Sequence, residues 1–508
     1  MTCIADVLIV GAGSAGCVLA ARLTETAALS VLLIEAGGEP TDPRIADPAA
    51  WPTLQKTAVD WDFAITPQPG LAHRADPWPR GRVVGGSSAI NAMGHMRGHP
   101  RDFDAWVAAG ATGWDYPALL PFFVTSETSP FAGDLGYGGD GPLPLIQPAS
   151  PHPLSHAHIA AGQALGLTPI RDHNGPVMAG PTLNTLTIRD GRRVSVADAY
   201  LTPTVRGRAN FALRTDTTVD RLIFEGSRAV GVRLADHTDL RARAAVILCA
   251  GSIASPLILM RSGIGPARDL AGCGISVRYD APGVGANLQD HLLASGNVYA
   301  ATAPLPPTTT QHSESLIYLH ATGQDRDDPP ELVVGIVTGA VVSKALSHHV
   351  QVPPDAYTLM FGITHPRSRG KITPGGPGPS DPPVIEPRYL SDENDRAHFL
   401  QALDWARLLG QAAPYDAWRG AEILPRPSDL TDDAARLAFI ARAATSHHHP
   451  IGTCAIGGPV APDLSVRRAE RLFICDGSVL PALTTGPVNA AILAVAERGA
   501  SLIARALR

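Results

Sequence analysis

The chain has 508 residues, and its length, composition and charge exclude several classes of protein. Hydrophobic residues make up 45% and charged residues 17%, as expected for a globular protein with a large interior. Because the formal net charge is −6 and no long basic run occurs, we expect no nucleic-acid partner. No apolar stretch reaches the roughly 20 residues that a membrane helix needs, so we expect no integral membrane segment.

The cysteines and the N-terminus both favour a soluble cytoplasmic enzyme. We expect no secretory signal before the first predicted strand. The six cysteines lack a Cys-x-x-Cys pair, and several lie in apolar runs, where a free buried thiol is expected. The absence of a disulfide pattern argues against an oxidising compartment. These cysteines are Cys3, Cys17, Cys249, Cys273, Cys454 and Cys475.

The N-terminal segment carries a dinucleotide-binding pattern. Residues 7–10 predict a buried parallel strand, residues 11–16 a glycine-rich turn, residues 17–23 a helix and residues 30–34 a second strand. In such a turn Gly11 permits the sharp bend, Gly13 lets a pyrophosphate approach the backbone, and Gly16 lets helix and strand pack closely. The helix N-terminus offers N–H groups to the phosphate, and Glu35 would accept the ribose hydroxyls. This pattern alone does not separate NAD from FAD.

Later segments complete a mixed α/β fold. The sequence predicts strands at 210–214 and 244–250, a hairpin of 221–224 with 229–234, and a helix from about 254 to 261. Residues 295–440 predict a separate antiparallel sheet with helices, suited to covering a substrate pocket, with strands at 332–337 and around 357–361. A strand at 471–477 and a helix from 489 to 506 follow. We therefore expect a Rossmann-like nucleotide-binding domain in 1–294, a substrate-binding cap in 295–440, and a return to the first domain in 441–508.

Two loops carry the remaining polar signals. Residues 80–93 combine paired glycines and serines and predict a second phosphate-binding loop, with an ordinary surface turn as the alternative. Near the C-terminus, His447, His448 and His449 precede a Pro-Ile-Gly-Thr run. Imidazole exchanges protons near neutrality, which favours a general base. An extended backbone would place His447 and His449 on one face and turn His448 away. A zinc site is disfavoured, because no cysteine or carboxylate follows at ligand spacing.

Taken together, these motifs resemble the glucose-methanol-choline (GMC) oxidoreductases, a family of FAD enzymes, along nearly the whole chain. The resemblance rests on the first glycine turn with Glu35-Ala36-Gly37, the loop 81–91, the runs 251–256 and 262–265, the runs 282–285 and 287–291, the His449-Pro450-x-Gly452-Thr453 element, and Asp476-Gly477-Ser478. One position departs from the family signature: His95 stands where relatives usually carry an aromatic residue or alanine.

The resemblance implies a set of FAD-binding residues. It assigns the adenosine half to the first glycine turn and Glu35, the pyrophosphate and flavin to the second loop, and the adenine to Val219. In some relatives a histidine at the position of Ile90 binds the flavin covalently, so FAD is expected here without a covalent link. The implied residues are Gly11, Gly13, Ser14, Gly16, Glu35, Ala36, Arg82, Gly85, Gly86, Ser87, Asn91, Val219, Asp476, Gly477 and Asn489.

The resemblance also implies the catalytic groups. His449 corresponds to the histidine that faces the flavin and would take the hydroxyl proton as the substrate carbon gives up hydride. Relatives place a second His or Asn where this chain has Pro487, and proline has no side-chain group that hydrogen-bonds. His447 is the candidate replacement, with a structural role as the alternative, whereas His448 is expected to be structural.

We expect oxidation of a small-molecule primary alcohol on an aromatic ring to an aldehyde, with O2 as acceptor and H2O2 as product. A dehydrogenase that passes electrons to a quinone and a cyanohydrin lyase of the same fold remain alternatives.

Overall fold

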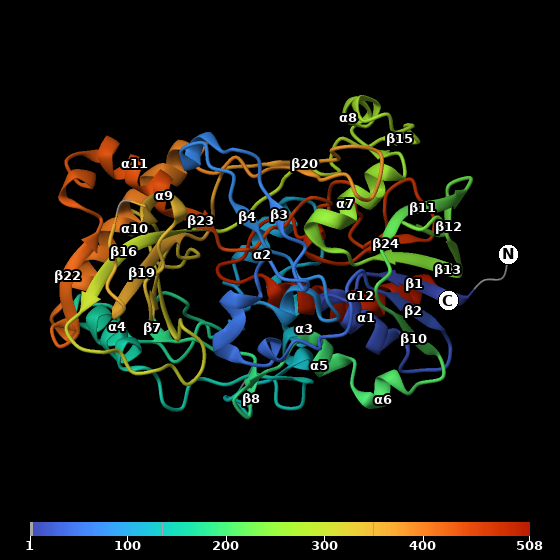
Figure 1. The fold of residues 1–508 in the computed structure, drawn as a ribbon. Coiled ribbons are helices and arrows are strands. Elements are labelled where there is room, and N and C mark those ends of the chain that lie inside the picture. The colour runs from blue at the N-terminus through green and yellow to red at the C-terminus, as the bar shows by residue number, and fades with distance from the viewer. Residues whose placement is uncertain (1–3, 135, 349) are drawn as a thin grey trace.

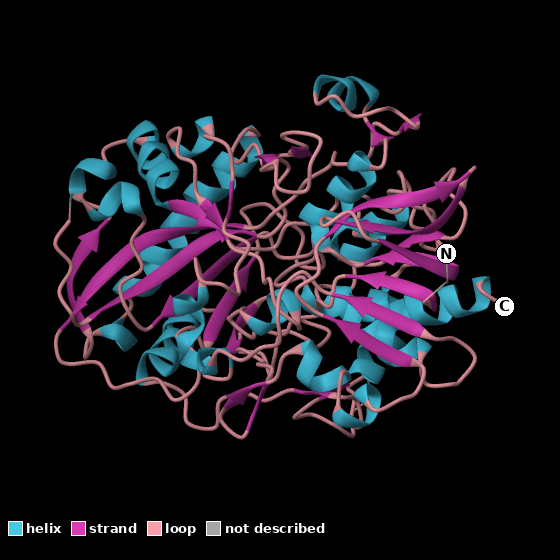
Figure 2. Ribbon diagram, turned by 45° about the vertical axis from the view of Figure 1, so that its right-hand side comes forward, coloured by secondary structure: helices cyan, strands magenta, loops and turns pink. Residues whose placement is uncertain are grey.

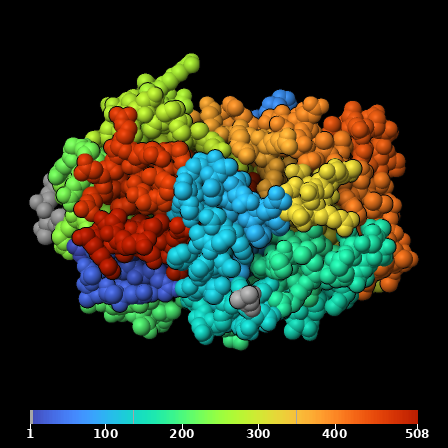
Figure 3. Space-filling view, turned by 180° about the vertical axis from the view of Figure 1, so that it is seen from behind, coloured from blue at the N-terminus to red at the C-terminus, as the bar shows by residue number. Residues whose placement is uncertain are grey.

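A computed structural model describes residues 4–134, 136–348 and 350–508. Within these ranges the strands form two seven-stranded sheets and several two-stranded ribbons. The two large sheets lie at opposite ends of the molecule, with loops gathered between them (Figures 1 and 2). On the back of the molecule, the light-blue segment that contains α2 (Asp102–Ala108) and α3 (Tyr116–Ser126) lies across the junction of the two halves (Figure 3). The fold is the mixed α/β fold that the sequence predicts.

The first sheet is Rossmann-like. Its central strands are parallel and consist of continuous runs of apolar residues, because helices and loops bury them on both faces. The predicted hairpin is confirmed and extends the sheet in the antiparallel sense. In spatial order the strands are β10 (Phe211–Arg214), β2 (Val31–Ile34), β1 (Ala5–Val10), β13 (Asp239–Leu248), β12 (Arg228–Leu234) and β11 (Val219–Glu225), and β24 (Leu472–Ile474) pairs with β13.

The two ends of the chain meet on this sheet. Helix α12 (Asn489–Ala506) matches the predicted final helix and packs against α1 (Ser14–Leu23). Buried Glu497 of α12 accepts hydrogen bonds from the Arg22 guanidinium at 2.7 and 2.9 Å and from the Tyr200 hydroxyl at 2.6 Å. The C-terminal segment is thereby fixed beside the glycine turn.

The second sheet is antiparallel throughout. One face packs against α4 (Pro153–Ala164), α10 (Glu393–Gln411) and α11 (Asp433–Ala443). Its strands are β22 (Arg419–Leu424), β16 (Leu292–Ala301), β19 (Ala356–Ile363), β18 (Leu332–Val337), β17 (Ser315–Leu319) and β7 (Gly180–Leu183), and β23 (Ala444–Ser446) pairs with β16. Strands β7 and β23 belong to this sheet although they lie outside 295–440. The domain boundaries at 294 and 440 stay a prediction.

The opposite face of this sheet carries a smaller apolar cluster that we call the inner face. The alternation of side chains along the strands separates it from the helix-covered face. It consists of Leu293, Leu316, Tyr318 and Val333 from the sheet, with Met96 and Met178 from preceding loops and Met360 at the margin.

Several predicted boundaries are wrong by a few residues. Helix α1 begins at Ser14 rather than 17, and β24 ends at Ile474 rather than 477. Strand β13 begins at Asp239 rather than 244, because its first residues alternate between buried and exposed as the hairpin partner of β12. Helix α7 (Gly251–Arg261) begins three residues before 254. The remaining elements are short: α5 (Val196–Tyr200), α6 (Pro203–Arg206), α8 (Ala267–Gly272), α9 (Lys344–Ser347), and the ribbons β3 (Phe63–Ala64) with β4 (Pro77–Trp78), β5 (Glu127–Thr128) with β6 (Leu143–Pro144), β8 (Ile188–Arg189) with β9 (Arg192–Arg193), β14 (Ile264–Gly265) with β15 (Tyr279–Asp280), and β20 (Lys371–Thr373) with β21 (Val384–Glu386).

The cysteines follow the prediction where they are described. Cys17, Cys249, Cys454 and Cys475 are buried free thiols, Cys273 is free and partly buried, and Cys3 lies outside the described residues. Within the described ranges, none of the helices is both long enough and apolar enough to cross a bilayer.

Candidate active site

The first glycine turn leaves room for a ligand at one glycine only. A Cβ on Gly11 would lie 2.5 Å from the oxygen of Cys249, and a Cβ on Gly16 would lie 1.9 Å from the oxygen of Gly11. A Cβ on Gly13 would find only the Cα of Gly86, at 3.9 Å. Gly13 is also the N-cap of α1, and no side chain caps this helix end. This open space, lined by backbone N–H groups, fits the pyrophosphate of FAD.

The second loop packs directly against the first. The Gly85 N–H donates to the oxygen of Ala12 at 2.8 Å, and a Cβ on Gly86 would lie 2.6 Å from the Cα of Gly13. The alternative of an isolated surface turn is therefore wrong for this part of the loop. Both glycines have positive φ, +101° and +54°, which other residues rarely adopt.

The side chains of the second loop are held by protein partners. Asn91 Oδ1 accepts from Arg193 Nη1 at 2.7 Å, and Ser87 Oγ accepts from the Gly81 N–H at 3.2 Å. Arg82 is exposed and lies over the ring of Trp61, 5.2 Å from its centroid. Across the site, Ser14 Oγ donates to Asn489 Oδ1 at 2.6 Å, which links α1 to α12.

Glu35 directly follows β2 and has a buried carboxylate. Its Oε2 accepts from the Ala12 N–H at 2.8 Å and its Oε1 from the Gly37 N–H at 2.9 Å. Each oxygen keeps a second lone pair, as a contact to ribose hydroxyls requires. Burial raises the pKa of Glu35 to about 7. Ala36 is partly buried, and Val219 is buried at the start of β11.

Asp476, one of the expected cofactor-site residues, has a buried carboxylate that protein donors hold in place. Its carboxylate accepts from the Gly251 N–H at 2.8 Å, Ser255 Oγ at 2.5 Å, and both the N–H and the Oγ of Ser478, at 2.8 and 2.5 Å. Burial raises its pKa. Because protein donors occupy both oxygens, any contact to FAD from here would come from the main chain. Gly477 is close-packed as well, since a Cβ would lie 2.9 Å from Ser252 Oγ.

The histidine cluster brings together residues far apart in the sequence. Nδ1 of His449 lies 2.9 Å from Nδ1 of His291, with the two rings edge to face at 88°. The His447 ring also lies beside His449, with the two ring centroids 4.5 Å apart. Burial lowers the pKa of His447 to about 4 and, together with the neighbouring imidazoles, holds the pKa of His449 well below 6.5. These rings are therefore neutral at pH 7.

His447 and His449 share a face, as predicted, but the extended backbone that led to this prediction is wrong. His448 has a φ of +65°, so the chain bends at this residue. The bend is held from both sides: the His448 N–H donates to Ser446 Oγ at 2.8 Å, and its oxygen accepts from Arg80 Nη2 at 2.7 Å.

Asp290 holds the main chain of the histidine segment in place. Its carboxylate accepts from the His449 N–H at 2.7 Å, from Ser446 Oγ at 2.5 Å and from the Tyr389 hydroxyl. Burial raises the pKa of Asp290 to about 6. Asp290 and His291 were not predicted as site residues, although they end the 287–291 motif. That motif was the signal that could have identified them.

Pro487 lies in the loop where the first domain meets the inner face. A Cβ on Gly486 would lie 2.8 Å from the Tyr318 hydroxyl, and a Cβ on Gly94 would lie 3.7 Å from Pro487 Cγ. Tyr318 is only 2% exposed, and in the described ranges its hydroxyl forms no hydrogen bond. The inner face is thus a candidate wall of the substrate pocket, which sequence reasoning did not identify.

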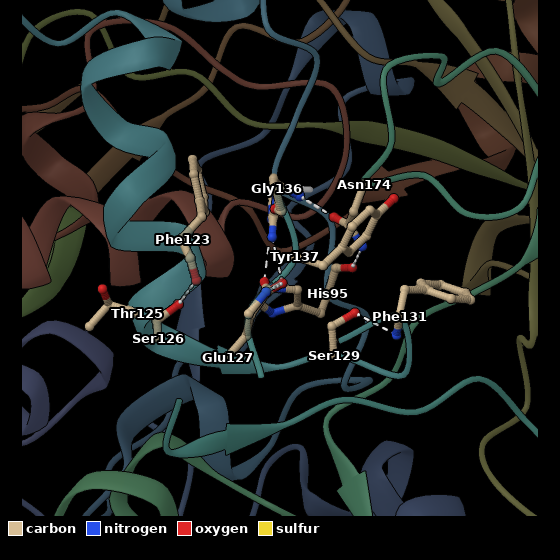
Figure 4. Close-up of polar contacts among 12 residues, drawn as sticks. His95, Phe123, Thr125, Ser126, Glu127, Ser129, Phe131, Gly136, Tyr137 and Asn174 are labelled. Carbon is tan, nitrogen blue, oxygen red and sulfur yellow. Dashed lines mark hydrogen bonds and ion pairs between the residues drawn. The ribbon is translucent and has the colours of Figure 1, made fainter. Parts of the chain in front are cut away.

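His95, the departure from the family signature, belongs to a buried polar cluster (Figure 4). Its Nε2 lies 3.3 Å from Glu127 Oε2, and Glu127 also pairs with Arg97. Asn174 accepts from the Arg97 N–H at 2.8 Å and donates to the oxygen of His95 at 3.1 Å. Glu127 is thus the buried charged neighbour of the His95 ring, and the hydrogen bonds of Asn174 hold the main chain at His95 and Arg97.

Comparisons with known proteins agree with this architecture. Family models described as GMC oxidoreductase match residues 5–293 and 366–496. The chain is 47% identical over 500 residues to pyridoxine 4-oxidase of Microbacterium luteolum, covering 97% of this chain and 98% of that protein. It is 36% identical over 536 residues to the mitochondrial choline dehydrogenase of Homo sapiens, covering 98% and 89%. The crystal structure of pyridoxine 4-oxidase from Mesorbium loti matches with a TM-score of 0.94 at 45% identity, covering 99% of each chain.

The His-x-His pair combined with proline at position 487 already makes the sequence resemble pyridoxine 4-oxidase among the members of this family, and two comparisons confirm that resemblance. The open, donor-lined space at Gly13 fits the FAD that the family uses. The chain belongs to the GMC oxidoreductase family and is an FAD-dependent enzyme that oxidises alcohols.

Proposed function

We propose that the protein oxidises pyridoxine to pyridoxal, with O2 as the acceptor and H2O2 as the second product. The observation that carries the proposal is the pair of neutral imidazoles, His447 and His449, whose ring centroids lie 4.5 Å apart. The 47% identity to a pyridoxine 4-oxidase over nearly the whole chain supports it.

The two histidines divide the work on the substrate hydroxyl. FAD, when bound, supplies the acceptor for the hydride. His449 is neutral and takes the hydroxyl proton, the function of a general base. The His447 side chain forms no hydrogen bond with the described residues, so its ring is available to bind the alcohol oxygen. It thereby replaces the partner that Pro487 cannot be.

The inner face would hold the aromatic ring of the substrate. Apart from Tyr318, its buried side chains are aliphatic groups and methionines, which would pack against a flat ring without competing for hydrogen bonds. Tyr318 adds one hydroxyl to this wall, and that hydroxyl is positioned against the loop that contains Pro487. A pyridine ring bearing hydroxyl groups matches an apolar wall with a single polar group.

FAD is bound without a covalent link in this proposal. Ile90 stands at the position used for covalent attachment in some relatives, and it is buried in an apolar cluster with Ile45, Leu54 and Val83. This position offers no nucleophile.

We also propose a cytoplasmic location and the division into domains at 294 and 440.

A choline-type dehydrogenase with a quinone acceptor is the second candidate, favoured by the 36% identity to choline dehydrogenase. An aerobic panel of alcohols that includes pyridoxine and choline, assayed for peroxide, separates the two. Peroxide with pyridoxine supports the first proposal. Turnover of another alcohol only with a dye acceptor, and no peroxide with pyridoxine, would refute it.

A further inference from the structure

The hydrogen bonds of His291 determine where its own proton lies. Nε2 of His291 is 2.8 Å from the main-chain oxygen of Thr364. A carbonyl oxygen can only accept, so this nitrogen carries the hydrogen. Burial and the neighbouring His447 lower the pKa of His291 to about 3, so the ring is neutral. Its Nδ1 therefore has a lone pair and no hydrogen.

The proton on His449 follows from this assignment. The two Nδ1 atoms of His291 and His449 are 2.9 Å apart, a hydrogen-bond distance. Two lone pairs cannot form a hydrogen bond, so Nδ1 of His449 must be the donor. Because His449 is neutral, it has a single N–H, and its Nε2 carries the lone pair. That nitrogen forms no hydrogen bond with any residue in the described ranges.

The main chain holds both rings in this relation. The His447 N–H donates to the oxygen of His291 at 2.8 Å, and the His449 N–H donates to Asp290 Oδ1 at 2.7 Å. The segment that carries the base is thus attached to the segment that carries His291 at two points. These main-chain N–H groups therefore fix the positions of the two residues that carry the imidazoles.

We propose that His291 is a positioning residue that keeps His449 in the tautomer with hydrogen on Nδ1, so that Nε2 faces the substrate hydroxyl as the proton acceptor. This inference rests on the proposed role of His449 as the base. Without an acceptor at His291, the hydrogen of His449 could occupy either nitrogen, and the molecules with hydrogen on Nε2 would be unable to take the substrate proton.

Two variants of His291 separate this role from a structural one. The side chain of His291→Asn places an oxygen where Nδ1 was and loses the contact to Thr364. The longer side chain of His291→Gln reaches toward Thr364 and offers no acceptor at the former Nδ1. Anaerobic flavin reduction by substrate should be about tenfold slower or worse for His291→Gln, the scale of one lost buried hydrogen bond, and within about threefold of wild type for His291→Asn.

The substrate dissociation constant, taken from the concentration dependence of the same reaction, should be unchanged in both variants. A purely structural role predicts equal losses, or the greater loss in His291→Asn, and either result would overturn the proposal. If flavin reduction is normal in His291→Gln but slow in His449→Ala, only the role of His291 is rejected, and His449 remains the base. Normal reduction in His449→Ala would reject the base itself.

A measurement on the wild-type holoenzyme covers the case in which the variants do not fold. Heteronuclear NMR of the labelled histidine ring nitrogens reports which nitrogen carries hydrogen. The proposal requires His449 to be protonated at Nδ1 and not at Nε2, and His291 to be protonated at Nε2. The reverse pattern on His449 would overturn it.

Discussion

The cofactor site can be tested by adding one methyl group in two places. At Gly13 a new Cβ would lie 3.9 Å from the nearest protein atom, and φ is −79°, which alanine adopts without strain. Gly13→Ala should therefore leave the stability of the apoprotein within about 0.5 kcal/mol of wild type. Its methyl group would stand in the space assigned to the pyrophosphate. Forcing an extra methyl group into an occupied site costs about 1–3 kcal/mol, so FAD should bind roughly 5- to 150-fold more weakly.

Gly16→Ala is the matched control, because its Cβ would lie 1.9 Å from the main-chain oxygen of Gly11. Helix α1 and the turn must move apart, so we expect a loss of folding stability of about 1–3 kcal/mol or more, even without cofactor. The assay is titration of each apoprotein with FAD by quenching of flavin fluorescence, with urea unfolding of the same apoproteins. If Gly13→Ala binds FAD as tightly as wild type, the pyrophosphate does not lie over this glycine. If the flavin cannot be released on denaturation, the non-covalent attachment is wrong.

Three further predictions concern the substrate side. His449→Ala should lower the rate of flavin reduction by roughly 10²- to 10⁴-fold while FAD stays bound, and His447→Ala should lower this rate as well. Anaerobic stopped flow measures the rate, and an unchanged rate in either variant would reject the role assigned to that histidine. Because burial holds the pKa of His449 well below 6.5, the base stays deprotonated as pH falls from 8 through 6.5, so the reduction rate should be flat across this range; an inflection at 6.5 or above would contradict it. Tyr318→Phe should lower kcat/KM for pyridoxine by roughly 2- to 13-fold and leave 4-pyridinemethanol unaffected; equal losses would mean that the hydroxyl supports the loop rather than the substrate.

Local patterns in the sequence were sufficient to predict most helices and strands of the Rossmann-like sheet. The apolar run of β1, the glycine turn and helix α12 were predicted closely because each depends on neighbours within a few residues. The hairpin of β11 and β12 was predicted for the same reason. Strand β13 was predicted too short, since its first residues are defined by pairing rather than by hydrophobicity.

The parts of the site that depend on distant contacts were not predicted. His291 and His449 are separated by 158 positions and meet only because β16 and β23 pair beside them. Tyr318 reaches the Pro487 loop from another strand of the same sheet. The bend at His448 depends on Arg80 and Ser446, and no periodicity in the histidine run indicates it.

The most direct test of the account is to mix the holoenzyme with pyridoxine in the absence of oxygen and follow the flavin absorbance. The account predicts that the flavin is bleached in wild type and far more slowly in His449→Ala, and that admitting air restores the colour with about one H2O2 formed per pyridoxal. A flavin that stays oxidised with excess pyridoxine, while another alcohol such as choline bleaches it, would contradict the proposed function.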